Sequence, residues 1–189
     1  EKATGNLNVS SGGNVAVNNI ERDTAGKANL VLNGADIKVE QGNQDDFFKG
    51  FTTNDKIELK SEGIEFNVNQ YNVTINPNAR LTGDVGKFTL RPSPINYSGS
   101  FMKVGGGTLT MSTQSKQFDG DFNVIQGKLE LLGDYTMKAG ETLGIGIGSD
   151  SRNDTHADYG QFHVAGNLNI EQGNLTVYAA NIVKKLITS

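Results

Sequence analysis

The sequence predicts an all-β fold, a right-handed parallel β-helix with a few loop excursions. Hydrophobic residues make up 35% of the 189 residues and aromatic residues 7%, and the chain has 24 Gly but only 3 Pro. Such a lean core suits a thin stack of coils in which each layer buries a narrow strip of side chains. Short segments of alternating apolar and polar residues recur along the chain, which is the second observation behind the prediction.

The recurring unit is a small or polar turn, often containing Gly and Asn, followed by about five residues in strict alternation. In the first half, this unit occupies residues 5–9, 13–17, 28–32, 35–39, 56–59, 64–68 and 71–75. In the second half, it occupies residues 107–111, 121–124, 127–131, 161–164, 166–170 and 173–177. Only residues 179–186 have the spacing of a turn or two of helix.

The spacing of these units predicts coils. Within a pair the step is seven or eight residues, as from Leu7 to Val15 and from Leu30 to Ile37. Between pairs it is roughly 20 residues or more, so we expect about eight or nine coils of two or three strands each. Inward Leu, Ile, Val and Phe should stack from layer to layer, and Gly and Asn should occupy the turns because both tolerate positive φ.

Two other structures are compatible with parts of this pattern. A Greek-key sandwich also has strands at regular spacing, although its turns are normally less uniform and its core richer in aromatic residues. Disorder would fit the polarity, but Leu and the β-branched residues recur too regularly for a disordered chain.

Three segments interrupt the repeat: residues 41–53, 91–97 and 148–158. We expect them to project from the coils as loops, and loops on a uniform scaffold are the usual location of binding specificity. The first residue is Glu1, and no leader precedes it, so the chain reads as a piece of something larger.

Charge and composition exclude several classes of function. The chain has 17 basic and 21 acidic residues, a net charge of -4, and no basic stripe of the kind that nucleic-acid-binding proteins carry. The absence of Cys excludes disulfides and thiolate metal sites. No apolar run approaches the ~20 residues of a membrane-spanning helix.

The segment 148–158 contains the residues that most resemble a site. A Ser-His-Asp triad could be drawn around His156, but three members crowded into one short loop do not normally align. The carboxylates of Asp150, Asp154 and Asp158 could bind Ca²⁺, but Arg152 stands where an acidic or amide ligand is expected. A solvated loop is the preferred interpretation, and calcium binding is left open.

The remaining candidates are weaker still. His163 lies between Phe162 and Val164, so the alternation directs it outward as a surface histidine. Residues 144–148, Gly-Ile-Gly-Ile-Gly, suggest a nucleotide loop, but no helix follows to bind a phosphate. We therefore expect no catalytic residue, no metal ligand, no cofactor and no enzymatic activity, and the residues that bind a partner are not assigned.

The second half resembles the C-terminal passenger region of bacterial type V autotransporters. The residues that carry the resemblance are 104–111, with Gly-Gly-Gly-Thr-Leu-Thr, then 118–124, 127–131 and 143–148. Residues 158–170 and 173–177 are similar to the late rungs of that region, so 104–177 match best. The first hundred residues resemble, more weakly, the filamentous haemagglutinin-like adhesins of two-partner secretion. Asn76-Pro77-Asn78 is similar to an Asn-Pro-Asn motif of that group, although its sequence context differs.

The resemblance implies that residues 1–189 are a single β-helix fragment of a larger secreted passenger on the surface of a Gram-negative bacterium. It implies an adhesin and virulence factor that binds a host-cell surface protein or glycan receptor and passes through its own outer-membrane β-barrel translocator. Self-association is a further contact left open. The alternatives are a secreted toxin or immunomodulator on the same scaffold and, less favoured, a β-helical polysaccharide lyase.

Overall fold

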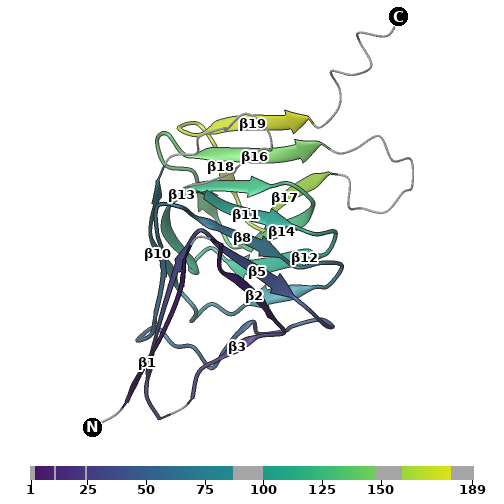
Figure 1. The fold of residues 1–189 in the computed structure, drawn as a ribbon. Coiled ribbons are helices and arrows are strands. Elements are labelled where there is room, and N and C mark those ends of the chain that lie inside the picture. Colours follow the sequence, from purple (N-terminus) through teal and green to yellow (C-terminus); the bar gives the residue numbers. More distant parts are fainter. Residues whose placement is uncertain (1–2, 11, 24, 87–99, 148–158, 180–189) are drawn as a thin grey trace, which may run out of the picture.

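The computed structural model describes residues 3–10, 12–23, 25–86, 100–147 and 159–179, and its strands pair in parallel (Figure 1). Within these residues, antiparallel contact is confined to one isolated bridge between Ile147 and Tyr159. None of the described residues forms a helix, so the described part contains no helix that could span a membrane. The all-β prediction is confirmed.

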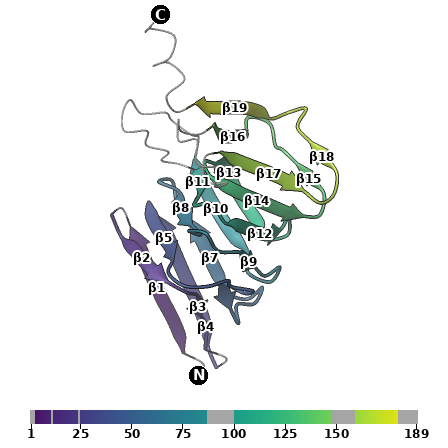
Figure 2. The ribbon, with the colours of Figure 1, turned by 90° about the vertical axis from the view of Figure 1, so that its right-hand side faces the viewer.

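The strands fall into three series that stack layer on layer (Figure 2). The first series is β1 (Thr4–Ser10), β4 (Lys27–Asn33), β7 (Lys56–Leu59), β10 (Leu81–Gly86) and the start of β13 (Lys116–Val124). The second is β2 (Asn14–Val17), β5 (Ala35–Val39), β8 (Ile64–Asn67), β11 (Ser100–Val104), the end of β13, β16 (Thr142–Ile147) and β19 (Asn174–Ala179). The third is β9 (Val73–Ile75), β12 (Thr108–Ser112), β14 (Gly127–Leu132) and β17 (Gly160–Val164).

Two short pairs complete the layers: β3 (Ile20–Glu21) with β6 (Phe48–Lys49), and β15 (Tyr135–Thr136) with β18 (Leu168–Asn169). Strands that are neighbours in sequence belong to different series, and each pairs with a strand one layer away. The chain therefore passes around the core and returns beside its earlier course, which makes the architecture solenoid-like. The large sheet curls around a continuous interior (Figure 1).

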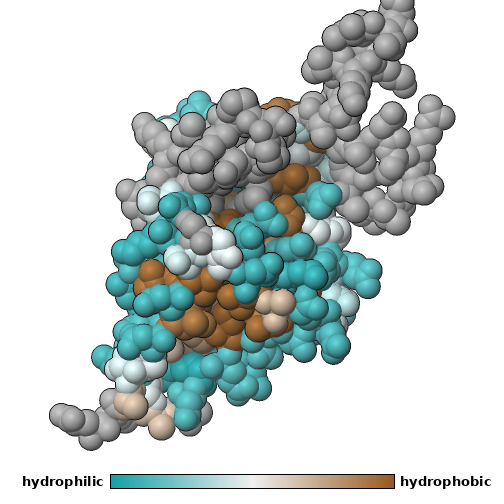
Figure 3. Space-filling model, viewed as in Figure 1, coloured by the Kyte–Doolittle hydropathy of each residue, from teal (hydrophilic) through white to brown (hydrophobic). Residues whose placement is uncertain are grey.

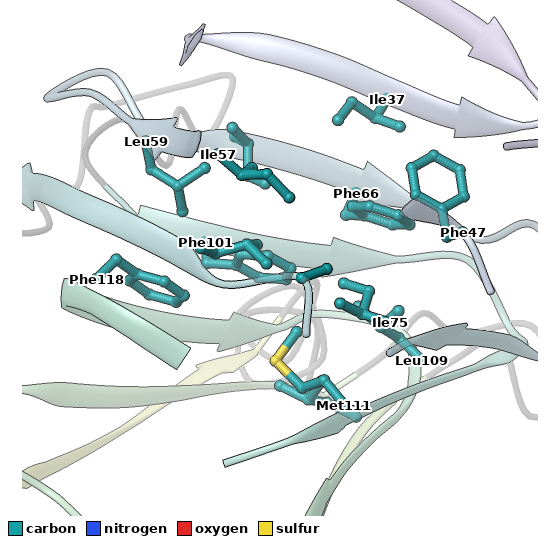
Figure 4. Close-up of a cluster of buried hydrophobic side chains, with 14 of the residues drawn as sticks. Ile37, Phe47, Ile57, Leu59, Phe66, Ile75, Phe101, Leu109, Met111 and Phe118 are labelled. Atoms are coloured by element: carbon teal, nitrogen blue, oxygen red, sulfur yellow. The ribbon is translucent and has the colours of Figure 1, made fainter. Parts of the chain in front are cut away.

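The interior consists of columns of inward side chains. Leu30, Ile57 and Leu81 are register partners in successive layers, and all three are buried. The rings of Phe66 and Phe101 stack at 6.2 Å between centroids (Figure 4). Burial of one such side chain contributes roughly 1.5–3 kcal/mol, so the columns hold neighbouring layers together.

Residues with positive φ form the corners. Between the first and second series, Gly12, Gly34 and Gly63 have φ of 77°, 71° and 70°. Between the second and third series, Asn69 and Gly105 have φ of 51° and 83°. This confirms the expectation that Gly and Asn occupy the turns because a left-handed backbone costs them least.

The sandwich alternative is wrong for the described residues. A hairpin would pair β4 with β5, whereas β4 pairs with β1 and β7. Within the described residues, fewer layers are stacked than the eight or nine coils expected for the whole chain. The longest column has seven layers: Val15, Ile37, Phe66, Lys103, Val124, Ile145 and Val177.

The segment 41–53 does not project as predicted. Phe47, Phe48 and Phe51 are buried in the core, and Phe48 pairs with Ile20 in the first coil. The rings of Phe47 and Phe48 meet edge to face at 5.0 Å. Burial of three aromatic rings outweighs the polarity of their neighbours, so the segment serves as part of a coil. Residues 91–97, 148–158 and 180–186 lie outside the described residues.

Candidate functional site

The third series of strands carries one line of polar side chains on its outer surface. Its inward residues are Val73, Leu109, Leu129 and Phe162, which are register partners in four successive layers. Since successive side chains on a strand point to opposite faces, the residue after each of these points outward. We call these four residues the outer polar column: Thr74, Thr110, Glu130 and His163.

The carboxylate of Glu130 is the centre of this column. It accepts a hydrogen bond from Lys128 Nζ at 2.9 Å, and His163 Nδ1 lies 2.8 Å from the same oxygen. The Thr110 hydroxyl donates to the other oxygen at 3.4 Å. The hydrogen bond from Lys128, and that from His163, hold the pKa of Glu130 below its ordinary value despite partial burial.

The prediction that His163 points outward is confirmed, since its side chain is 53% exposed. A hydroxyl, an ammonium, a carboxylate and an imidazole therefore lie side by side on an open surface. Neighbouring strands are ~4.8 Å apart, so the column offers hydrogen-bonding groups at a regular interval. Such an array can bind an extended polar ligand, such as a glycan chain or a peptide, by several weak contacts.

A second polar group lies inside the core, next to aromatic rings. Lys116 Nζ lies 2.6 Å from Glu141 Oε1, and both side chains are buried. The ammonium also lies 4.6 Å from the centre of the Phe118 ring, within the range of a cation–π contact. Burial lowers the pKa of Lys116, and the hydrogen bond to Glu141 opposes that change.

The same glutamate has two further donors. The Tyr135 hydroxyl donates to Glu141 Oε2 at 3.2 Å, and the Lys138 amide donates to that oxygen at 2.8 Å. Burial and the charge of Glu141 raise the pKa of Tyr135 above its ordinary value. Because the carboxylate is fully engaged and enclosed, this cluster joins layers and is not open to a ligand.

Lys103 is a second buried lysine, with main-chain partners. Its ammonium donates to the carbonyl oxygens of Gly107 and Gln126 at 2.8 and 2.9 Å, and also to those of Val104 and Gly105. Burial lowers the pKa of Lys103 to about 7. The side chain therefore joins two successive turns at the corner between the second and third series.

Sequence reasoning missed Lys103, Lys116 and Glu141. Lys103 and Lys116 occupy inward positions in strand segments that the alternation did not predict, because a lysine replaces an apolar residue there. The alternation could have indicated the two lysines, because each lies two residues from a phenylalanine on the same strand. Lys103 and Phe101 share one face of β11, and Lys116 and Phe118 share one face of β13.

The residues predicted to mimic a triad or a calcium site lie outside the described residues, namely His156, Asp150, Asp154 and Asp158. Within the described ranges, no group of three or more His, Cys, Asp or Glu side chains is placed to hold a metal ion. Residues 144–147 form part of strand β16 and not a nucleotide loop. Comparisons with protein-family models, with curated proteins and with solved structures found no match to this chain.

Proposed function

We propose that the chain is a right-handed parallel β-helix from the passenger region of a bacterial autotransporter, and that it acts as an adhesin on the cell surface. The observation that carries the proposal is the outer polar column, in which Thr74, Thr110, Glu130 and His163 stand in register on an open surface. A repeated array without a deep pocket is suited to adhesion and not to catalysis.

General rules of chain connection support the right hand. A chain that leaves one strand and returns to lie parallel beside it makes a right-handed crossover in nearly all proteins. Every coil in the described residues makes this kind of return, for example from β4 through β5 and β6 to β7. The resemblance of residues 104–177 to autotransporter rungs supports the same fold and the route of export through an outer-membrane translocator.

The proposed mechanism is the sum of weak contacts. Each layer contributes one or two hydrogen bonds to a host-cell surface protein or glycan, and linked contacts raise the overall affinity well above that of one. Glu130 is the residue expected to contribute most, because its carboxylate is held between Lys128 and His163 in one orientation.

The test is attachment of the purified, fluorescently labelled chain to host epithelial cells and to matrix-coated plates. The variant Lys128→Ala/Glu130→Ala/His163→Ala should reduce attachment by about tenfold or more if linked contacts are lost together. The matched control is Lys56→Ala/Glu58→Ala/Thr82→Ala, which removes a lysine, its glutamate partner and the polar register neighbour of that glutamate from the outer surface of the first series. It should attach like the parent chain.

Two outcomes would reject the proposal. If neither variant changes attachment, or both reduce it equally, the outer polar column is not the binding surface. If the chain damages cells without attaching to them, the toxin interpretation replaces adhesion.

A further inference from the structure

The lateral surface of the coils is polar, so a ligand on that surface has to be recognised by polar groups. Figure 3 shows hydrophobic side chains inside the open first coil, where the described residues begin, and largely hydrophilic side chains around it. On the outer surface of the third series (Figure 2), a second column stands in register beside the outer polar column: Thr108, Lys128 and Gln161. The charged groups of these two columns decide which ligand the surface can bind.

The carboxylate of Glu130 is largely occupied by donors of the chain itself. Its Oε1 accepts from Lys128 Nζ at 2.9 Å and lies 2.8 Å from His163 Nδ1. Its Oε2 accepts from the Thr110 hydroxyl at 3.4 Å. The Glu130 side chain is 23% exposed, whereas those of Lys128 and His163 are 34% and 53% exposed. The charged groups that a ligand can reach are therefore mainly those of Lys128 and His163.

The contact with Glu130 also determines which nitrogen of His163 carries the proton. The hydrogen bond from Lys128, and that from His163, hold the pKa of Glu130 below its ordinary value, so the carboxylate is ionised and can only accept. Nδ1 of His163 must then carry the proton, and Nε2 of the neutral ring is an acceptor. Histidine is the side chain that ordinarily changes its charge between pH 5 and 8. A second proton turns Nε2 into a donor and the ring into a cation.

The second proton on His163 changes the charge balance of this surface. Within the described residues, β17 pairs with β14, whose charged side chains are Lys128 and Glu130. β16 also packs against β17 and carries no charged side chain. The charged side chains of β13, which packs against β17 as well, belong to the core or to the first and second series: Lys116, Asp119 and Asp121. One ammonium and one carboxylate therefore balance while His163 is neutral, and one positive charge is in excess once it is protonated.

We propose that this surface binds an anionic group of an acidic polysaccharide between Lys128 and His163, and that binding tightens as His163 gains a proton. Glu130 holds both donors in position, so one anion of the ligand can accept charge-assisted hydrogen bonds from both. The two columns contain no apolar side chain, and they offer hydroxyl and amide groups to sugar hydroxyls but no contact to the apolar side chains of a peptide. The inference rests on the proposed function, because it specifies the ligand of the same surface.

The test is the affinity of the parent chain for polygalacturonate, a polymer whose carboxylates stay ionised, at about pH 7.5 and about pH 5.5. One additional cation beside an exposed anion should tighten binding by about fivefold at the lower pH. The neutral polymer dextran should bind more weakly at both pH values. Dextran sulfate distinguishes the source of the anion, because it carries sulfate groups and no carboxylate.

Three variants assign the effect to its residues. His163→Gln should bind polygalacturonate with the same affinity at both pH values, and Lys128→Gln should bind it more weakly than the parent chain at both. The matched control is Lys38→Gln, because Lys38 pairs with Glu40 on the outer surface of the second series and its side chain is 44% exposed. It should bind like the parent chain. Circular dichroism at both pH values should show the same folded state for all three variants, because the substituted side chains lie on the outer surface.

Three results would overturn the inference: no binding of either acidic polymer, a gain at low pH that persists in His163→Gln, or tighter binding of polyglutamate than of either acidic polysaccharide. The last result would assign the surface to acidic peptides. If the outer polar column is needed for attachment to cells but neither acidic polymer binds, the proposed adhesion stands and this inference fails. If polygalacturonate binding depends on His163 but the triple variant still attaches to cells, the proposed adhesion fails instead.

Discussion

The two buried lysines occupy equivalent positions in different series but are neutralised in different ways. Lys116 follows Leu81 in an inward column and meets the carboxylate of Glu141 at 2.6 Å. Lys103 lies between Phe66 and Val124 in another inward column, and its partners are main-chain carbonyls of two turns. One site is an ion pair between side chains, and the other is a cation held by the backbone.

The difference shows two ways in which a stack of coils can tolerate a charge in its interior. At Lys116, each charge is compensated by the other side chain, so replacing only one of the two leaves an uncompensated charge in the core. At Lys103, the acceptors belong to the corner itself, so no second substitution can remove them. The ammonium of Lys103 is therefore expected to specify the register between its turn and the next, because a slipped strand would separate it from the Gln126 carbonyl in the neighbouring layer.

The largest effect is expected from breaking the ion pair on its acidic side. Glu141→Ala leaves the Lys116 ammonium buried without its carboxylate and should lower the free energy of unfolding by about 3–5 kcal/mol. Urea denaturation followed by circular dichroism measures this loss. Glu58→Ala is the control, because its ion pairs with Lys56 and Lys60 lie on the outer surface and should contribute at most about 1 kcal/mol.

The next effect distinguishes the two lysines by whether a second substitution can restore the lost stability. Lys116→Met/Glu141→Leu removes both charges and should recover part of the stability lost in Glu141→Ala, because a buried ion pair is often no more stable than an apolar pair. Recovery should be incomplete because the Tyr135 hydroxyl and the Lys138 amide lose their acceptor. Lys103→Met should cost about 2–4 kcal/mol, because it leaves several carbonyls without a donor. A double variant at Lys116 that is no more stable than Glu141→Ala would contradict the comparison.

A smaller effect follows from the pKa of Lys103. Burial lowers this pKa from 10.5 to about 7 in the folded chain, so the unfolded chain binds more protons between those two values. Stability should therefore rise with pH in this window, by about 2 kcal/mol between pH 7 and pH 9. The measured quantity is the difference between the parent chain and Lys103→Met at each pH. A difference that stays flat or falls would show that the ammonium remains charged throughout.

The smallest effect is expected on the outer surface. Glu130→Gln and His163→Ala remove exposed contacts of the outer polar column and should each change the free energy of unfolding by less than about 1 kcal/mol. Thermal melting of both variants measures this change. A loss as large as that of Glu141→Ala would mean that the column supports the fold and is not free to bind a partner.

Strands with regular alternation could be predicted from the sequence, as at residues 28–32 and 127–131. Leu at every second position and mostly polar residues between them indicate both the strand and the face that is buried. Strand β16 could not, because Gly144 and Gly146 occur where a Cβ would collide with the Asn123 side chain and the Ile125 backbone. Those collisions come from other layers, and sequence alone does not place layers side by side. For the same reason, the outward direction of His163 could be predicted, but its contact with Glu130 could not.

The central claim is that each strand pairs in parallel with strands one layer away and not with its neighbour in sequence. Nuclear Overhauser contacts between the methyl groups of selectively labelled Leu30 and Ile57, and between the backbones of β4 and β7, test this claim most directly. The structure predicts strong contacts between β4 and both β1 and β7. Strong Hα–Hα contacts between β4 and β5, as in an antiparallel hairpin, would contradict it.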